Sequence, residues 1–173
     1  PFARLLVEVG GIALLRDGRY LGVTEQQWDD YGRVFPLCFE DHWQIGRYAE
    51  SVGSVLLATD GMFDTFFPAW IRNEPVNINV SQARFFMDPE KLETGNRSEA
   101  ETVARMEGVL RSVDPHTVGD DKTIVTVINS DITCDKQSEE YYREPDWTEL
   151  KKKFDEKWKK AAYPGLFETV ADD

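Results

Sequence analysis

The sequence predicts an α+β protein in which antiparallel strands come first and most helices follow. A hairpin signal, Asp17-Gly18, stands near the start, and short β-branched or apolar runs cover 54–59 and 123–128. Apolar residues repeat at helical spacing in two later stretches, 98–113 and 146–161. Strands and helices do not alternate regularly, so parallel βαβ units are not expected.

Composition indicates one folded domain and excludes several kinds of partner. The chain has 173 residues, of which 41% are hydrophobic, enough for one core. Its net charge of −12 argues against nucleic acid and anionic membranes as partners, because both bind basic surfaces. No apolar run is long enough for a membrane span, no signal peptide is recognisable, and Cys38 and Cys134 lack metal-type spacing. We therefore expect a cytoplasmic protein with reduced thiols.

The N-terminal part is expected to form two or three antiparallel strands. A first strand over 3–9 is predicted to stop at Gly10-Gly11. Strands 12–16 and 19–24 flank Asp17-Gly18, a turn in which both central residues are expected to adopt positive φ.

The middle of the chain contains the predicted central strand. Residues 24–50 read as a connection whose first residues cap a short helix. The bounded apolar run Ser54–Thr59 is typical of a strand buried on both faces. Aromatic residues at helical spacing over 63–72 predict a core helix that Pro68 ends or kinks. Residues 73–97 suggest a flap-like insertion with short helices.

The last part contains two capped helices. Ser98 and Glu101 form a capping-box pattern for a helix to about Ser112. Residues 131–173 are predicted to be a polar linker and an amphipathic C-terminal helix that begins at the cap Asp146. The apolar stripe of that helix is expected to pack on the body; it comprises Trp147, Leu150, Phe154, Trp158 and Ala161.

Acidic residues stand next to two of the predicted strands. Asp60, Gly61 and Asp64 follow the central strand, and Asp60 and Asp64 would share a helix face if a helix begins there. Asp120 precedes strand 123–128. If the two strands are antiparallel neighbours, Asp60 and Asp120 lie at one sheet edge, where a cation would offset their repulsion. Oxygen ligands favour Mg²⁺ or Mn²⁺. Each acidic stretch by itself is also compatible with an ordinary turn beside a strand.

Both stretches together resemble motifs of the metal-dependent serine/threonine phosphatases of the type-2C (PPM) family. The first motif is Leu56-Leu-Ala-Thr-Asp60-Gly-Met-Phe-Asp64, which resembles the family's apolar strand followed by Asp-Gly-x-x-Asp. The second is Gly119-Asp120-Asp121-Lys-Thr123 before a β-branched strand, with Asp121 where Asn is usual. The resemblance covers about residues 3–129, including a helix between the motifs.

The resemblance implies part of an antiparallel β-sandwich with flanking helices, and hydrolysis of phosphoserine and phosphothreonine in proteins. Asp60 and Asp120 would hold the two Mg²⁺ or Mn²⁺ ions that activate water. Asp64 would serve a looser third metal site, and Gly61 would let an ion approach the backbone. Residues 1–130 would be the C-terminal portion of the phosphatase domain, with 131–173 appended.

Two departures from the family pattern leave other readings open. Gly11 stands where the family usually has Asp, and the family's early motifs are not found in this sequence. We therefore expect an incomplete catalytic domain, inactive alone, that self-associates through unpaired strand edges. One alternative is a non-catalytic phosphatase-like binding or regulatory module. Another is an acidic, cation-binding β-domain with a C-terminal docking helix.

Overall fold

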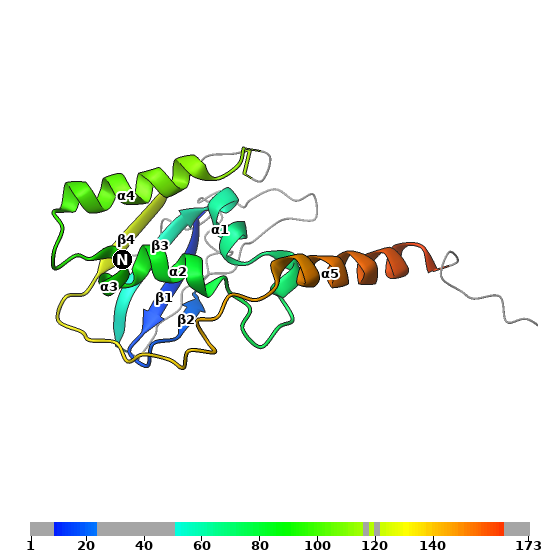
Figure 1. Cartoon of the computed structure of the whole chain (residues 1–173), viewed down its shortest axis with the longest axis horizontal. Helices are drawn as coiled ribbons and strands as arrows, with labels where there is room; N and C mark the ends of the chain where they lie inside the picture. The colour runs from blue at the N-terminus through cyan, green and yellow to red at the C-terminus, as the bar shows by residue number, and fades with distance from the viewer. Residues whose placement is uncertain (1–8, 24–50, 116–117, 120–121, 165–173) are drawn as a thin grey trace, which may run out of the picture.

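One sheet of four antiparallel strands forms the centre of the chain, in the order β2-β1-β3-β4. We analysed a computed structural model, which describes residues 9–23, 51–115, 118–119 and 122–164 (Figure 1). The predicted strand over 3–8 and the predicted connection over 24–50 lie outside these ranges. The strands are β1 (Val9–Leu15), β2 (Tyr20–Gly22), β3 (Val52–Thr59) and β4 (Ile124–Ile128).

The helices are α1 (Asp60–Phe66), the 3-10 turn η3 (Ala69–Ile71), α2 (Val80–Met87), α3 (Pro89–Leu92), α4 (Glu99–Ser112) and α5 (Trp147–Ala162). Helices α1 to α4 follow the first three strands, β4 comes between α4 and α5, and the α+β class with an antiparallel sheet is confirmed. Within the described ranges all strands belong to one sheet, so the second layer of a sandwich stays a prediction.

The hairpin at Asp17-Gly18 is confirmed, but its turn differs from the expected one. β1 and β2 pair antiparallel, and Leu14 lies opposite Tyr20. Gly18 has φ +86°, whereas Asp17 is not among the residues with positive φ. A single left-handed glycine is typical of a three-residue hairpin loop with a bulge rather than of a two-residue type I′ turn.

The predicted strand break at Gly10-Gly11 is wrong. β1 runs through both glycines and pairs with β3 from Val9 to Leu15. A side chain at Gly10 would overlap the ring of Phe63 from α1, so the missing Cβ makes room for an aromatic ring. Here glycine marks close packing inside a strand, not the end of one.

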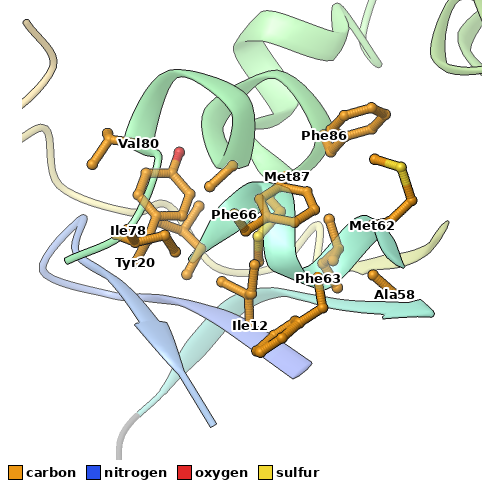
Figure 2. Close-up of a cluster of buried hydrophobic side chains, with 13 residues drawn as sticks. Ile12, Tyr20, Ala58, Met62, Phe63, Phe66, Ile78, Val80, Phe86 and Met87 are labelled. Atoms are coloured by element: carbon orange, nitrogen blue, oxygen red, sulfur yellow. The ribbon is translucent and has the colours of Figure 1, made fainter. Parts of the chain in front are cut away.

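The core lies between one face of the sheet and the helices α1 and α2 (Figure 2). Ile12 of β1 and Leu56 of β3 are fully buried and face each other across the strands. β3 is the predicted central strand, but its two faces differ: Ser54, Leu56 and Ala58 are buried, whereas Val55, Leu57 and Thr59 are half-buried. The other core members are Leu14, Tyr20, Met62, Phe63, Phe66, Ile78, Val80, Ala83, Phe86 and Met87.

Pro68 ends the aromatic helix, as predicted: α1 stops at Phe66 and η3 begins after the proline. The region 73–97 contains the expected short helices, α2 and α3. α2 is part of the core, however, because Val80, Ala83, Phe86 and Met87 are all buried. A segment with this burial supports the sheet and cannot move as a flap without opening the core.

The capping box of α4 is confirmed in both directions. The Ser98 Oγ accepts from the backbone N–H of Glu101, and the Glu101 carboxylate accepts from the backbone N–H of Ser98. The predicted apolar stripe of this helix packs only in part. Met106, Leu110 and Val113 contact the core cluster, whereas Val103 is 46% exposed.

Residues 129–146, the strap, cross the molecule in contact with the body, although 131–145 were expected to be a linker. The backbone N–H of Asp135 donates to the Arg16 carbonyl at 2.7 Å. On the other strand beside the same turn, the backbone N–H of Tyr20 donates to the Tyr141 hydroxyl at 2.9 Å. The free thiol of Cys134 lies against Gly53 of β3. The strap therefore fastens the hairpin and β3 together.

Helix α5 is capped by Asp146, whose side chain accepts from the Glu149 backbone N–H. Its first half contacts η3, and Trp147, Leu150 and Phe154 are half-buried. The rest projects away from the sheet (Figure 1), and Trp158 is 57% exposed. The predicted packing of the stripe thus holds for its first half. No helix in the described residues has the length and apolar character to cross a membrane.

Candidate metal centre

The end of β3 and the beginning of β4 lie side by side at one sheet edge. The two strands pair antiparallel, which is the condition on which the predicted site depends, and Ala58 lies opposite Ile124. One step further, the Thr59 N–H donates to the Thr123 carbonyl at 3.1 Å, and the Thr123 N–H donates to the Thr59 hydroxyl at 3.2 Å. The two acidic stretches are therefore joined through the residues next to them.

Asp60 is the first residue of α1 and directly follows β3. Its Oδ1 accepts a hydrogen bond from the Gly61 N–H at 2.7 Å, and both residues are half-buried. Thr59, at the N-cap, makes no side-chain cap bond to α1. Its hydroxyl oxygen instead accepts from Thr123, so this side chain ties the helix start to β4.

Asp64 lies one helical turn after Asp60, because α1 begins at Asp60 as the prediction required. The residue is exposed as a whole, but its carboxyl is partly withdrawn from water. This burial raises the pKa of Asp64, and the negative charge of Asp60 raises it further, while Arg72 acts in the opposite direction. The two carboxylates therefore repel each other, which is the electrostatic condition that a bound cation would relieve.

The helix that carries the two acids is firmly anchored. Met62, Phe63 and Phe66 are buried in the core, opposite the acidic side of the helix. The Thr65 hydroxyl accepts from the Gln82 side chain of α2 at 2.6 Å. Asp60 and Asp64 are thus held on a rigid element, as a preorganised ligand set requires.

The described residues on either side of the second acidic stretch are held by hydrogen bonds. Val118 is buried and its N–H donates to the Asp114 carbonyl at 3.0 Å. Lys122 donates from Nζ to the Val113 carbonyl at the end of α4, at 2.7 Å. Asp120 and Asp121 lie outside the described residues, so the approach of Asp120 to Asp60 stays a prediction.

The described part of the site offers oxygen donors of the kind that hard cations prefer. These are the carboxylates of Asp60 and Asp64; Gly61 lies in the first turn of α1, where backbone carbonyls accept helical hydrogen bonds, and its N–H donates to Asp60. Within the described ranges, no three His, Cys, Asp or Glu residues gather as a metal cluster. The sequence did not point to Thr59 or Arg72 as parts of the site, since their roles depend on contacts with Thr123 and Asp64.

Comparisons with known proteins supply no family assignment. No family model, no curated protein and no solved structure matches the chain.

Proposed function

We propose that the chain provides metal ligands for a Mg²⁺- or Mn²⁺-dependent protein serine/threonine phosphatase of the type-2C kind. The observation that supports the proposal is the pair of hydrogen bonds between Thr59 and Thr123, which joins the residues next to the two acidic stretches. The order and spacing of the two motifs, on which the family resemblance rests, support it independently.

The donor set fits a hard divalent cation. Asp60 and Asp120 would hold the two ions of the catalytic centre, and Asp64 would bind a further ion more loosely. A cation near Asp60 and Asp64 would offset the repulsion that contributes to the raised pKa of Asp64.

The chemistry proposed for the site is hydrolysis of a phosphoserine or phosphothreonine ester. When bound, the two ions would lower the pKa of a water molecule and neutralise phosphate charge. The residues of this chain would hold and orient the ions. Asp60 and Asp64 stay fixed because the buried side chains of Met62, Phe63 and Phe66 anchor α1 in the core. A protein nucleophile is not needed for this reaction class. We propose that turnover also needs the family's early motifs, supplied by further sequence.

The test uses the full-length protein with Mn²⁺, para-nitrophenyl phosphate and a phosphothreonine peptide. Asp60→Asn and Asp120→Asn should each abolish activity, and each should weaken Mn²⁺ binding measured by calorimetry. Asp131→Asn is the matched control, because Asp131 is an exposed acid beyond the far end of β4. Full activity in both site variants would refute the proposal.

A non-catalytic phosphatase-like module is the second candidate, favoured by Gly11 in β1 where the family has Asp. The same experiment separates the two. Mn²⁺ binding that depends on Asp60, without phosphatase activity in the full-length protein, would support the module and not the enzyme.

A further inference from the structure

The first turn of α2 holds the last turn of α1, the helix that carries two acids of the candidate metal centre. The backbone N–H of Asn79, the cap residue of α2, donates to the Phe66 carbonyl at 2.8 Å. In the same turn of α2, the Gln82 side-chain N–H donates to the Thr65 hydroxyl at 2.6 Å. The end of a helix leaves backbone carbonyls without partners in the helix, so both bonds act where a short helix opens first.

The Gln82 side chain is itself held in its orientation. Its Oε1 accepts from Asn79 Nδ2 at 3.0 Å, and its backbone N–H donates to Asn79 Oδ1 at 3.3 Å. At the other end of the contact, the Thr65 hydroxyl donates to the Met62 carbonyl at 2.7 Å. Both residues of the Gln82–Thr65 hydrogen bond therefore have further bonded partners, which gives this bond a defined direction.

Asp64 depends on the last turn of α1 more than Asp60 does. Asp60 directly follows β3, and the residue before it is hydrogen-bonded to Thr123. Asp64 lies in the last turn of the seven-residue helix, directly before the threonine that Gln82 contacts. The buried side chains keep α1 on the core, but the hydrophobic effect is non-directional, whereas a hydrogen bond fixes direction. The position of the Asp64 carboxylate relative to that of Asp60 thus depends on the bond from α2.

We propose that Gln82 is the positioning residue for Asp64 and thereby sets the affinity of the looser metal ion. The inference rests on the proposed function, in which Asp64 binds a further ion beside the catalytic pair. Gln82 acts on the ion through Thr65 and the last turn of α1. Residues that orient metal ligands from outside the coordination shell change metal affinity when they are replaced.

Titration of the full-length protein with Mn²⁺, followed by calorimetry, tests this role. Gln82→Leu keeps a side chain of similar size but removes its hydrogen bonds. It should weaken by about tenfold the binding of the ion that Asp64→Asn removes. The binding that requires Asp60 should stay as in the parent protein. In an Asp64→Asn background, Gln82→Leu should change nothing further, because the ligand that it positions is gone.

Gln137→Leu is the matched control. Gln137 is half-buried in the strap, and its side-chain N–H donates to the Asp17 carbonyl, also at 2.6 Å. The same substitution there breaks a bond of the same length away from α1, so it should leave all Mn²⁺ binding unchanged. Thr65→Val removes the acceptor and should reproduce the effect of Gln82→Leu. Thr65→Ser keeps the hydroxyl and should retain the parent's affinity.

Hydrogen exchange in the metal-free protein tests the positioning directly. The Phe67 N–H donates to the Phe63 carbonyl at 3.2 Å and closes the last turn of α1. Its exchange should be about fivefold faster in Gln82→Leu, because the turn opens more often without the bond from α2. In Gln137→Leu it should be unchanged.

The outcomes distinguish a failure of this inference from a failure of the proposed function. The positioning role is wrong if Asp64→Asn removes no ion, or if Gln82→Leu binds that ion as tightly as the parent does. Unchanged exchange at Phe67 in Gln82→Leu, or an equal loss of affinity in Gln137→Leu, would also overturn it. If neither Asp60→Asn nor Asp64→Asn affects Mn²⁺ binding, the proposed metal centre itself fails, and the role of Gln82 fails with it.

Discussion

Replacing Gly53 by alanine tests whether the strap is packed against β3 as the structure shows. Gly53 is buried, and an added Cβ would overlap the Sγ atom of Cys134. The Cβ of Cys134 would be 3.9 Å away, an ordinary contact. The clash therefore involves one atom. Overpacking of this kind lowers the free energy of unfolding by about 1–3 kcal/mol.

Shortening the Cys134 side chain should relieve the clash that Gly53→Ala creates. Cys134→Ala removes Sγ and should cost about 1 kcal/mol, because the side chain is only half-buried. In the double variant, alanine at position 53 meets no sulfur, so its stability should be close to that of Cys134→Ala alone. The two changes should thus show a favourable coupling of about 1–3 kcal/mol.

Urea unfolding of the four proteins, followed by circular dichroism, measures this coupling. The free energy of unfolding falls linearly with urea concentration, and a variant with a different slope has a changed unfolding transition. Only variants with equal slopes are therefore compared. Gly95→Ala is the control, because a Cβ at Gly95 has no atom within 4 Å. Additive effects of the two substitutions, or no effect of Gly53→Ala, would refute the docking of the strap at Cys134.

Three further predictions concern the turn, the cap and the acidic site. Gly18→Ala should lower the free energy of unfolding by at least about 1 kcal/mol, because Gly18 has φ +86° and a Cβ there would overlap a carbonyl oxygen of the strap; urea unfolding checks this. Ser98→Ala should cost about 1 kcal/mol of stability by removing the cap of α4, and hydrogen exchange should speed up in its first turn. For Asp64 the pKa is raised in the folded state, so its ionisation lowers stability as pH rises through that pKa. Asp64→Asn should therefore stabilise the metal-free chain at neutral pH but not in acid, which thermal unfolding at both pH values would reveal.

The sequence predicted correctly the features that depend on residues close together in the chain. The capping box at Ser98, the proline stop at Pro68 and the hairpin around Gly18 each depend on residues a few positions apart. The pairing of β3 with β4 entered the sequence analysis only as a condition, suggested by two apolar or β-branched runs that each have an acid at one end, and the structure shows it. Of these features, the β3–β4 pairing is the one on which the candidate site depends.

Features that depend on distant contacts could not be predicted. The continuation of β1 through Gly10 depends on Phe63, which follows far later in the chain. The strap looked like a linker because its residues are polar, yet its polar groups bond to the backbone of Arg16 and Tyr20. α5 has one continuous stripe in sequence, but η3 reaches only its first half, so Trp158 is left exposed. In each case the deciding partner is elsewhere in the sequence.

The strap also has a consequence for how the chain folds during its synthesis. The hydrogen bond from Tyr20 to Tyr141 joins residues 121 positions apart in the sequence. The β1–β2 hairpin is therefore synthesised long before the part of the strap that binds it. Until the ribosome has released the strap, the exposed end of the hairpin and the β3 surface around Gly53 have no cover from it. Nascent chains arrested before residue 134 should therefore be more sensitive to protease at the hairpin than chains arrested well after residue 146.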